Sequence, residues 1–393
     1  MIRDWRFVIL VLAALAPCDI AAQTATGQPA PTPVPAGWQW TTDGRVFFGF
    51  NYQLRKFTDF SAWESQNWIT ASGERPIARG TLRLASMFSF EPFTMRDIGS
   101  PQVFQTGEMF RGAPIIDYQH PHDLVMGLGA EYRRPLRRVT LRAGVDLVGT
   151  PTLGPPVFMH RPSAAEIPPA PLSHHHLDSS HITPGVVRGG LEAGAWRFEG
   201  SWFRGREPDS NRTDLDLGAL DSAAVRVSWI RGAWSAQISG AYLKEPEAVT
   251  PFDAKKLTAS IGRTGGRLAW LAAFGQKREV HGNLEAYLFE ATLHATVGDI
   301  VYTRIESVAK DILDVGFHRG AFHRHRQSQI GALTVGYLRD VWRGRGGSFG
   351  IGADVTGYLV PANLEESYGS PVSFHVFARY RLPAKSGSAS HVH

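Results

Sequence analysis

The stretch that decides the fold reads Val139-Thr140-Leu141-Arg142-Ala143-Gly144-Val145-Asp146-Leu147. An apolar residue stands at every odd position, and a polar residue or glycine stands at every even one. Successive side chains of a β-strand point to opposite faces, so this pattern predicts a strand with one wholly apolar face. Four other stretches alternate in the same way, at 124–132, 234–240, 348–355 and 372–380. A soluble β-sandwich also alternates, so the number and spacing of the strands must decide.

The whole chain can be divided into strands of about ten residues. Sixteen are predicted, at 44–56, 65–75, 80–93, 122–134, 138–150, 183–193, 195–205, 221–231, 233–243, 255–263, 267–277, 284–296, 299–309, 326–340, 348–359 and 371–382. Segments 65–75 and 299–309 fit least well, which leaves 14 or 12 strands as alternatives.

The connections between these strands alternate in length. Short turns near 76–80, 134–138, 193–195, 231–233, 263–267, 296–299 and 341–347 alternate with long loops at 57–64, 94–121, 151–182, 206–220, 244–254, 278–283, 310–325 and 360–370. Outer-membrane barrels have short periplasmic turns and long outer loops. The sequence therefore predicts an all-β, antiparallel transmembrane β-barrel in the bacterial outer membrane. Trp196, Trp234, Trp270 and Trp342 lie near short turns, where an interfacial aromatic girdle is expected.

The ends of the chain predict export. Arg3 and Arg6 precede an apolar run at 7–16, and Ala21 and Ala22 supply a cleavage point, so residues 1–22 read as a signal peptide. Residues 23–37 are rich in Thr, Pro, Ala and Gln and are expected to form a disordered periplasmic linker. The barrel is expected to span 38–383, with a polar tail at 384–393.

Composition excludes several classes of protein. The one cysteine, Cys18, leaves with the signal peptide, so the mature chain forms no internal disulfide. No run of roughly 18 apolar residues follows, which excludes membrane-spanning helices. The formal net charge is +5, but the basic residues are scattered singly through the strands. Nucleic acid is therefore not expected as a partner.

Histidines are concentrated in two consecutive long loops. Seven of the fifteen fall between residues 120 and 181. Imidazole and carboxylate side chains suit copper, zinc or nickel. We expect no required cofactor, and copper or zinc as the ions that could bind. The predicted metal-contacting residues are His120, His122, Asp123, His160, His174, His175, His176 and His181. Such a site would be exposed and of moderate affinity; the alternative is that these side chains only hydrogen-bond the loops.

Two further clusters lead to weaker hypotheses. His318, His323 and His325 lie among arginines in the 310–325 loop and are expected to be solvated, with lipopolysaccharide phosphate as an alternative contact. Ser179 and Ser180, beside Asp178 and His181, have the residue types of a barrel hydrolase. Neighbours on one loop cannot easily build a triad, and no Gly-x-Ser-x-Gly turn exists, so we expect no enzyme.

The polar faces of the predicted strands should line the lumen. They carry Arg83, Glu91, Glu131, Arg142, Asp146, Glu290, His294, Asp354, His375 and Arg379. A barrel of this size is wide enough for an aqueous channel, unless the 151–182 loop folds inward. The sequence leaves open and plugged barrels as alternatives.

Several motifs resemble those of a poorly characterised family of proteobacterial exported proteins. They lie at 110–114, 118–124, 154–164, 177–183 and 205–208. Members of that family often accompany copper and other heavy-metal efflux genes. The resemblance implies a metal-linked role, with metal-efflux components as partners, and carries no catalytic residues onto this chain.

The expected function is that of a passive channel, or of a metal-contacting surface, linked to copper or zinc handling through histidine-rich loops on the outside of the barrel. The alternative is a general small-solute porin with incidental histidines. In both cases the expected partners are outer-membrane lipid, lipopolysaccharide and the barrel-assembly machinery.

Overall fold

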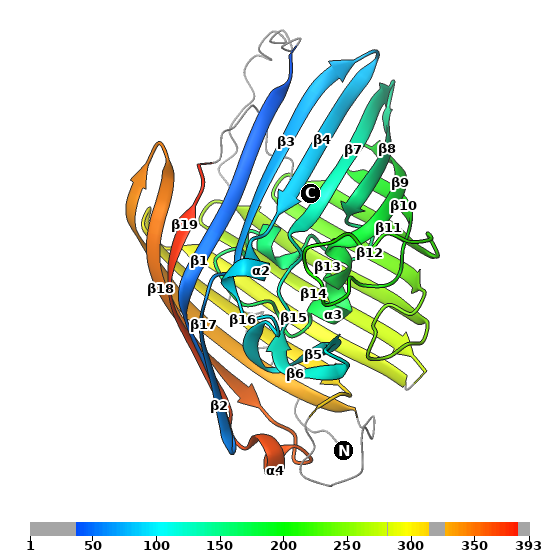
Figure 1. The fold of residues 1–393 in the computed structure, drawn as a ribbon. Helices are drawn as coiled ribbons and strands as arrows, with labels where there is room; N and C mark the ends of the chain where they lie inside the picture. Colours follow the sequence, from blue (N-terminus) through cyan, green and yellow to red (C-terminus); the bar gives the residue numbers. More distant parts are fainter. Residues whose placement is uncertain (1–36, 281, 314–326, 384–393) are drawn as a thin grey trace. The chain divides into compact units, whose positions relative to one another are not determined.

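The computed structural model describes residues 37–280, 282–313 and 327–383. Its strands form an antiparallel barrel that closes where the first strand pairs with the last (Figure 1). The strands of the barrel are β1 (Gln39–Arg55), β2 (Thr58–Glu64), β3 (Asn67–Ile77), β4 (Gly80–Phe88), β7 (Val125–Leu136), β8 (Val139–Gly149), β9 (Thr183–Ala193), β10 (Trp196–Phe203), β11 (Ser222–Arg231), β12 (Trp234–Leu243), β13 (Ala254–Gly265), β14 (Leu268–Glu279), β15 (Gly282–His294), β16 (Asp299–Lys310), β17 (Ser328–Gly344), β18 (Gly347–Leu359) and β19 (Val372–Arg381).

The barrel has sixteen strands, as predicted. Its sheet contains seventeen segments, but β2 and β3 run in line and count as one strand. Both pair with β1, β2 along residues 49–55 and β3 along residues 39–46. The two least certain predicted strands exist as β3 and β16.

Two predicted long loops are wrong. Residues 57–64 were expected to form a loop, but β2 occupies most of them, because its hydrogen bonds to β1 continue almost to the turn at Lys56 and Phe57. Residues 278–283 were also expected to form a loop. There β14 and β15 pair as far as Glu279 and Gly282, so the two strands take up most of this segment.

Strand alternation separates an apolar outer face from a polar inner face. Val145, Ile351 and Val376 are each at least half exposed, whereas Glu290 and Arg379 are almost fully buried. Met126 is an exception, because it was expected on the outer face but is only 2 % exposed. The register shifts near it on both sides of β7, and such irregularities redirect side chains.

Several features bear on membrane insertion. Trp196, Trp234 and Trp342 are exposed near short turns, as an interfacial girdle requires. In the described parts of the chain, no helix is both long and apolar enough to cross a membrane. The predicted signal peptide (1–22), all but the last residue of the linker (23–37), the basic cluster at 318–325 and the tail (384–393) lie outside the described residues.

Two long connections fill the lumen, and we call them together the plug. The first, residues 89–124, contains α2 (Glu91–Thr94) and a separate hairpin of β5 (Ser100–Phe110) and β6 (Ala113–Gln119). The second, residues 150–182, contains η1 (Phe158–His160), α3 (His174–Leu177) and η2 (Ser179–His181). No residue from 151 to 182 is exposed. The sequence left open whether this barrel is plugged, and the structure answers that it is.

The plug contacts the wall on many sides. Residues 151–182 bond to side chains of β1, β10, β12, β15, β16 and β19. Apolar contacts add to these bonds, as where Phe158 and Met159 pack with Trp68 and Val148 of the wall. A sixteen-stranded barrel leaves a wide lumen, and here the plug supplies side chains to occupy it. The prediction that these histidine loops lie outside the barrel is therefore wrong.

Candidate functional site

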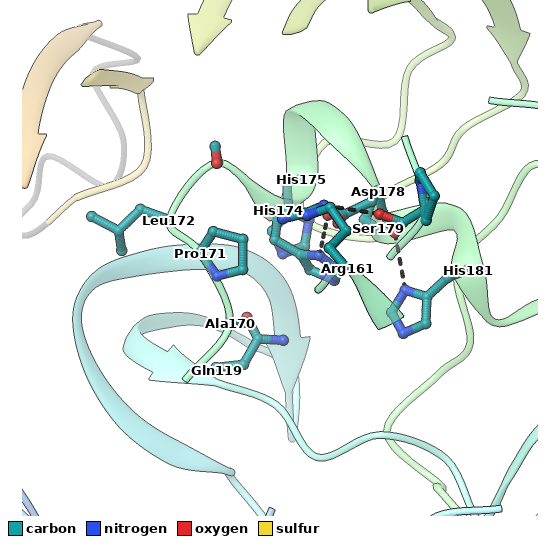
Figure 2. Close-up of polar contacts among 12 residues, drawn as sticks. Gln119, Arg161, Ala170, Pro171, Leu172, His174, His175, Asp178, Ser179 and His181 are labelled. Atoms are coloured by element: carbon teal, nitrogen blue, oxygen red, sulfur yellow. Dashed lines mark hydrogen bonds and ion pairs between the residues drawn. The ribbon is translucent and has the colours of Figure 1, made fainter. Parts of the chain in front are cut away.

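A buried arginine fixes the histidine-rich segment to the barrel wall. Arg161 Nε donates to Glu290 Oε1 of β15 at 2.6 Å, and Nη2 donates to Oε2 at 3.1 Å. Its Nη1 donates to Asp178 Oδ2 at 2.5 Å. All three side chains are at most 2 % exposed. Asp178 therefore holds a fixed position in the lumen (Figure 2).

Asp178 in turn orients two imidazoles. Its Oδ1 lies 2.7 Å from His174 Nδ1, and its backbone oxygen lies 3.0 Å from His181 Nδ1 (Figure 2). A third imidazole lies close by, where His122 Nδ1 is 2.8 Å from Glu91 Oε2. His122 and His174 both contact the ring of His181 edge to face. Three of the predicted metal residues thus come together.

His175 belongs to a different group, with two glutamates from other loops. Its Nδ1 lies 3.5 Å from Glu247 Oε1 and 3.9 Å from Glu207 Oε2. One ligand atom of each residue lies within 4.8 Å of the others. His175 and Glu247 are buried and Glu207 is half-buried. Among the described residues, His175 Nδ1 and both oxygens of Glu207 are buried without a hydrogen-bond partner.

The ionisation of this carboxylate group depends on its burial and its neighbours. Burial, with the negative charges of Glu247 and Glu108, raises the pKa of Glu207 to about 8. Burial also favours a raised pKa for Glu247, but Lys277 and His175 outweigh it, so this pKa lies well below its usual range. Burial lowers the pKa of His175 to about 4, against the opposing effect of Glu247. His175 is therefore neutral near pH 7 and keeps a lone pair for a ligand.

A hollow between three loops leads to this group. It has a volume of about 950 Å³, part of which is open solvent, and is lined by the β5–β6 turn, residues 204–210, Asp216 and Ala248. Glu207 lies on its lining, together with Glu108. We call this hollow the vestibule. The carboxylate group thus adjoins a space that an ion could enter.

Two other predicted metal residues, His120 and Asp123, use their side chains in hydrogen bonds and ion pairs with protein groups. His120 Nε2 lies 2.5 Å from Glu108 Oε1, and its Nδ1 lies 2.9 Å from Pro121 O. Asp123 Oδ1 accepts from Arg212 Nη1 at 3.3 Å. The structure does not place His120 or Asp123 in a shared group of metal ligands with His122. The hydrogen-bonding alternative describes them better.

His160 and His176 also lie apart from both groups. His160 Nε2 is 3.4 Å from Met87 Sδ, and its ring packs edge-on against Trp68. Both ring nitrogens of His176 are buried without a hydrogen-bond partner. Burial and the positive charges of three lysines, Lys277 foremost, hold the pKa of His176 well below its usual value. Cations nearby make His176 a poor metal ligand.

The structure also bears on the hydrolase alternative. Ser179, Asp178 and His181 lie in the plug, whereas that hypothesis places its serine and histidine on the outer face near a rim. The Ser179 hydroxyl accepts from Lys256 Nζ at 3.1 Å, and His181 Nδ1 bonds to the backbone of Asp178. These contacts do not form a serine–histidine pair.

Sequence reasoning missed the partners of the histidines. Glu207 and Glu247 are single acidic residues in loops of ordinary composition, and Arg161 lies 17 residues before Asp178. Glu207 and Arg161 had a signal, because they lie in two motifs, 205–208 and 154–164, that resemble those of the exported family. The expectation of exposed ligands was wrong, since His174, His175, His176 and His181 are buried.

These features define a class, an antiparallel sixteen-stranded barrel with a plugged lumen, and solved structures share its barrel fold. An anion-selective porin from Comamonas acidovorans superposes with a TM-score of 0.52 at 12 % identity, covering 88 % of this chain and 100 % of the other. OmpF of Salmonella typhi, solved with daunomycin, gives 0.53 at 9 % identity, covering 87 % and 97 %. No family model and no curated protein matches the sequence.

Proposed function

We propose that this protein is a bacterial outer-membrane barrel whose plug binds a copper or zinc ion at His175, Glu207 and Glu247. The observation that carries the proposal is the convergence of one imidazole and two carboxylates beside the vestibule. The barrel would act as a passive, constricted channel that takes the ion from its long-loop end.

The chemistry of the group supports a transition metal. One nitrogen and two oxygen donors, with room for water, make up a donor set that zinc and copper accept. Lys277 Nζ bonds both oxygens of Glu247, at 2.8 and 2.9 Å, and so fixes that carboxylate. Glu207 has no such partner among the described residues. An ion would replace the proton that Glu207 holds near neutral pH.

The outer surface supports the membrane location. Exposed apolar side chains recur on the outer face of nearly every strand, among them Val145, Val225, Ile238, Ile351 and Val376. A band of this kind is stable against lipid tails and costly in water. Lipid, lipopolysaccharide and the barrel-assembly machinery are therefore the partners that we propose, and the resemblance to exported proteins adds metal-efflux components.

A general small-solute pore is the second candidate. Its support is the barrel fold shared with the Comamonas porin. The plug opposes it, because the loop at 151–182 crosses the lumen and bonds to many strands of the wall. Under this alternative the histidines serve only to hold the plug.

Metal titration of the refolded, full-length barrel in detergent tests the first candidate. We expect calorimetry with Cu²⁺ or Zn²⁺ to detect one binding event that Glu207→Gln and His175→Ala remove. Glu245→Gln is the matched control, since Glu245 is an exposed carboxylate two positions from Glu247. Wild-type binding in both site variants would refute the carboxylate site.

Conductance in planar bilayers separates the two candidates. If the protein is a metal channel, its conductance should be small. Zn²⁺ should change this conductance in the wild type but not in Glu207→Gln. A general pore predicts the same conductance with and without the metal, in both proteins.

A further inference from the structure

The strongest unexplained feature of the plug is a trio of buried imidazoles, His122, His174 and His181. All three side chains are at most 7 % exposed. The ring centroids of His122 and His181 lie 5.3 Å apart, and those of His174 and His181 lie 5.2 Å apart. His122 comes from the first plug segment and the other two from the second, so only the fold brings them together.

Each of the three rings is held through the same atom. The Nδ1 atoms of His122, His174 and His181 face Glu91 Oε2, Asp178 Oδ1 and the Asp178 backbone oxygen, respectively. Acceptors at Nδ1 place a proton there, so Nε2 is the atom through which each ring, in its neutral form, would bind a metal. Histidine ligands of metals are oriented in this way, with the second ring nitrogen donating to a carboxylate or a backbone carbonyl.

Two of the three Nε2 atoms have no hydrogen-bond partner among the described residues that would offset their burial. The Nε2 atoms of His122 and His181 are both buried without a hydrogen bond. Leaving a buried polar atom unpaired costs roughly 1–3 kcal/mol. Two such atoms in neighbouring rings indicate a shared ligand.

The support behind the trio is rigid. Asp178 anchors two of the rings and is itself bonded to Arg161, which bonds to Glu290 of the wall. Ser163 Oγ donates to the same glutamate at 2.7 Å. Glu91, which anchors the third ring, also accepts from the His122 backbone N–H at 2.8 Å. Such supporting bonds preorganise ligands and raise metal affinity.

We infer that His122, His174 and His181 form a second, all-nitrogen site for a copper or zinc ion, separate from the carboxylate site. With metal–nitrogen bonds of about 2.0–2.1 Å, two imidazoles at a tetrahedral angle have their ring centroids roughly 5 Å apart. The His122–His181 and His174–His181 spacings match this value. In this structure the ring nitrogens of the trio do not all lie within 4.8 Å of one another, so the rings turn about their Nδ1 contacts when the ion binds.

The two sites adjoin each other. His174 and His175 are consecutive in the sequence, and their ring centroids lie 5.7 Å apart. His122 also lines a cavity, together with Glu91, His120 and Met159. An ion bound at the carboxylate site beside the vestibule would therefore lie next to the all-nitrogen site.

Electron paramagnetic resonance of the full-length barrel with Cu²⁺ tests this inference. We expect two ions per chain in the wild type. The variant Glu207→Gln should retain one ion, and its spectrum should show hyperfine coupling to several nitrogens. This variant leaves the trio intact, so the test does not depend on a histidine mutant that fails to fold.

Histidine variants then assign the site. His181→Gln should lose the nitrogen-rich signal and keep the other ion, whereas His176→Gln, a buried neighbour outside both groups, should keep both. Heat-dependent mobility on a gel checks that each variant has folded. A spectrum of Glu207→Gln without coupling to more than one nitrogen would overturn the inference. A different result would count against the carboxylate site alone. In that case Glu207→Gln would bind as many ions as the wild type and still show coupling to several nitrogens.

Discussion

Arg161 and Glu290 form a doubly bonded ion pair between the plug and the barrel wall, and neither side chain is more than 2 % exposed. Arg161 also bonds Asp178, which orients His174 and His181. The geometry of the trio thus depends on a contact with β15. A change that weakens the Arg161–Glu290 pair should therefore lower the stability of the plug and also disturb metal binding by His174 and His181.

Removing one partner of this pair should loosen the plug. Glu290→Ala leaves a buried guanidinium with only Asp178 to balance it, and breaking a buried pair in this way costs about 3–5 kcal/mol. We expect faster hydrogen exchange at residues 158–181 and larger single-channel conductance. Arg339→Ala is the control, because Arg339 pairs with Asp299 at the surface, where such pairs contribute about 0–1 kcal/mol. Equal effects of the two variants would contradict this role for Glu290.

A glycine in β14 permits the close approach of the histidine turn. A Cβ atom at Gly275 would lie 2.7 Å from the His176 backbone oxygen. Gly275→Ala should therefore displace α3 from the wall, lower stability by about 1–3 kcal/mol and weaken metal binding. Gly357→Ala in β18 is the matched control, since nothing lies within 4 Å of its Cβ position. Urea unfolding measures the stability of both variants and metal titration measures their affinity. Equal values for the two variants would contradict the close approach at Gly275.

The barrel could be predicted because each strand carries its own pattern. Alternation such as that of 139–147 reports which side chains face out, and it needs no knowledge of the partner strand. The pattern failed at Met126, where a bulge shifts the register, and at β2, which lacks clean alternation. Both failures arise from hydrogen bonding between strands, which a single segment does not reveal.

For the plug, the sequence predicted that the loops are rich in histidine but not that they lie inside the barrel. The cluster of histidines was visible, but loops of this type lie outside most barrels, and nothing local indicates that 151–182 turns inward. Its burial depends on partners far away in the sequence, such as Glu290 for Arg161 and Glu306 for the backbone of Ser173. Glu207 and Glu247 escaped notice for the same reason.

A charge on the outer face should destabilise the barrel according to its depth. Ile351 lies near the middle of β18 and is about half exposed. If this face meets lipid, Ile351→Lys should cost about 2–4 kcal/mol, while Leu359→Lys at the strand end should cost about 0–1 kcal/mol. Urea titration in phospholipid vesicles measures both. Two equally mild substitutions would argue against a lipid-facing surface.

Acid should loosen the β5–β6 hairpin through Glu108. This carboxylate lies 2.5 Å from both Arg212 Nη2 and His120 Nε2. Burial acts to raise the pKa of Glu108, but Arg212 and His120 outweigh it and bring the pKa to about 2, against an ordinary value of 4.5. The folded state thus favours the ionised form. Its contribution, up to about 3 kcal/mol, is complete above pH 4.5 and is lost as the pH falls toward 2.

His120 acts in the same direction at higher pH. Burial lowers its pKa despite Glu108, so the folded state favours the neutral ring, and stability falls as the pH drops below about 6.5. Proteolysis of the hairpin near Arg111 at a series of pH values, with an acid-tolerant protease, measures the opening. Glu108→Gln should open more readily at pH 7, because Arg212 loses its closest partner, and should lose the dependence between pH 4.5 and 2. A wild-type hairpin that resists cleavage equally at pH 3 and pH 7 would show that this ion pair does not hold the plug.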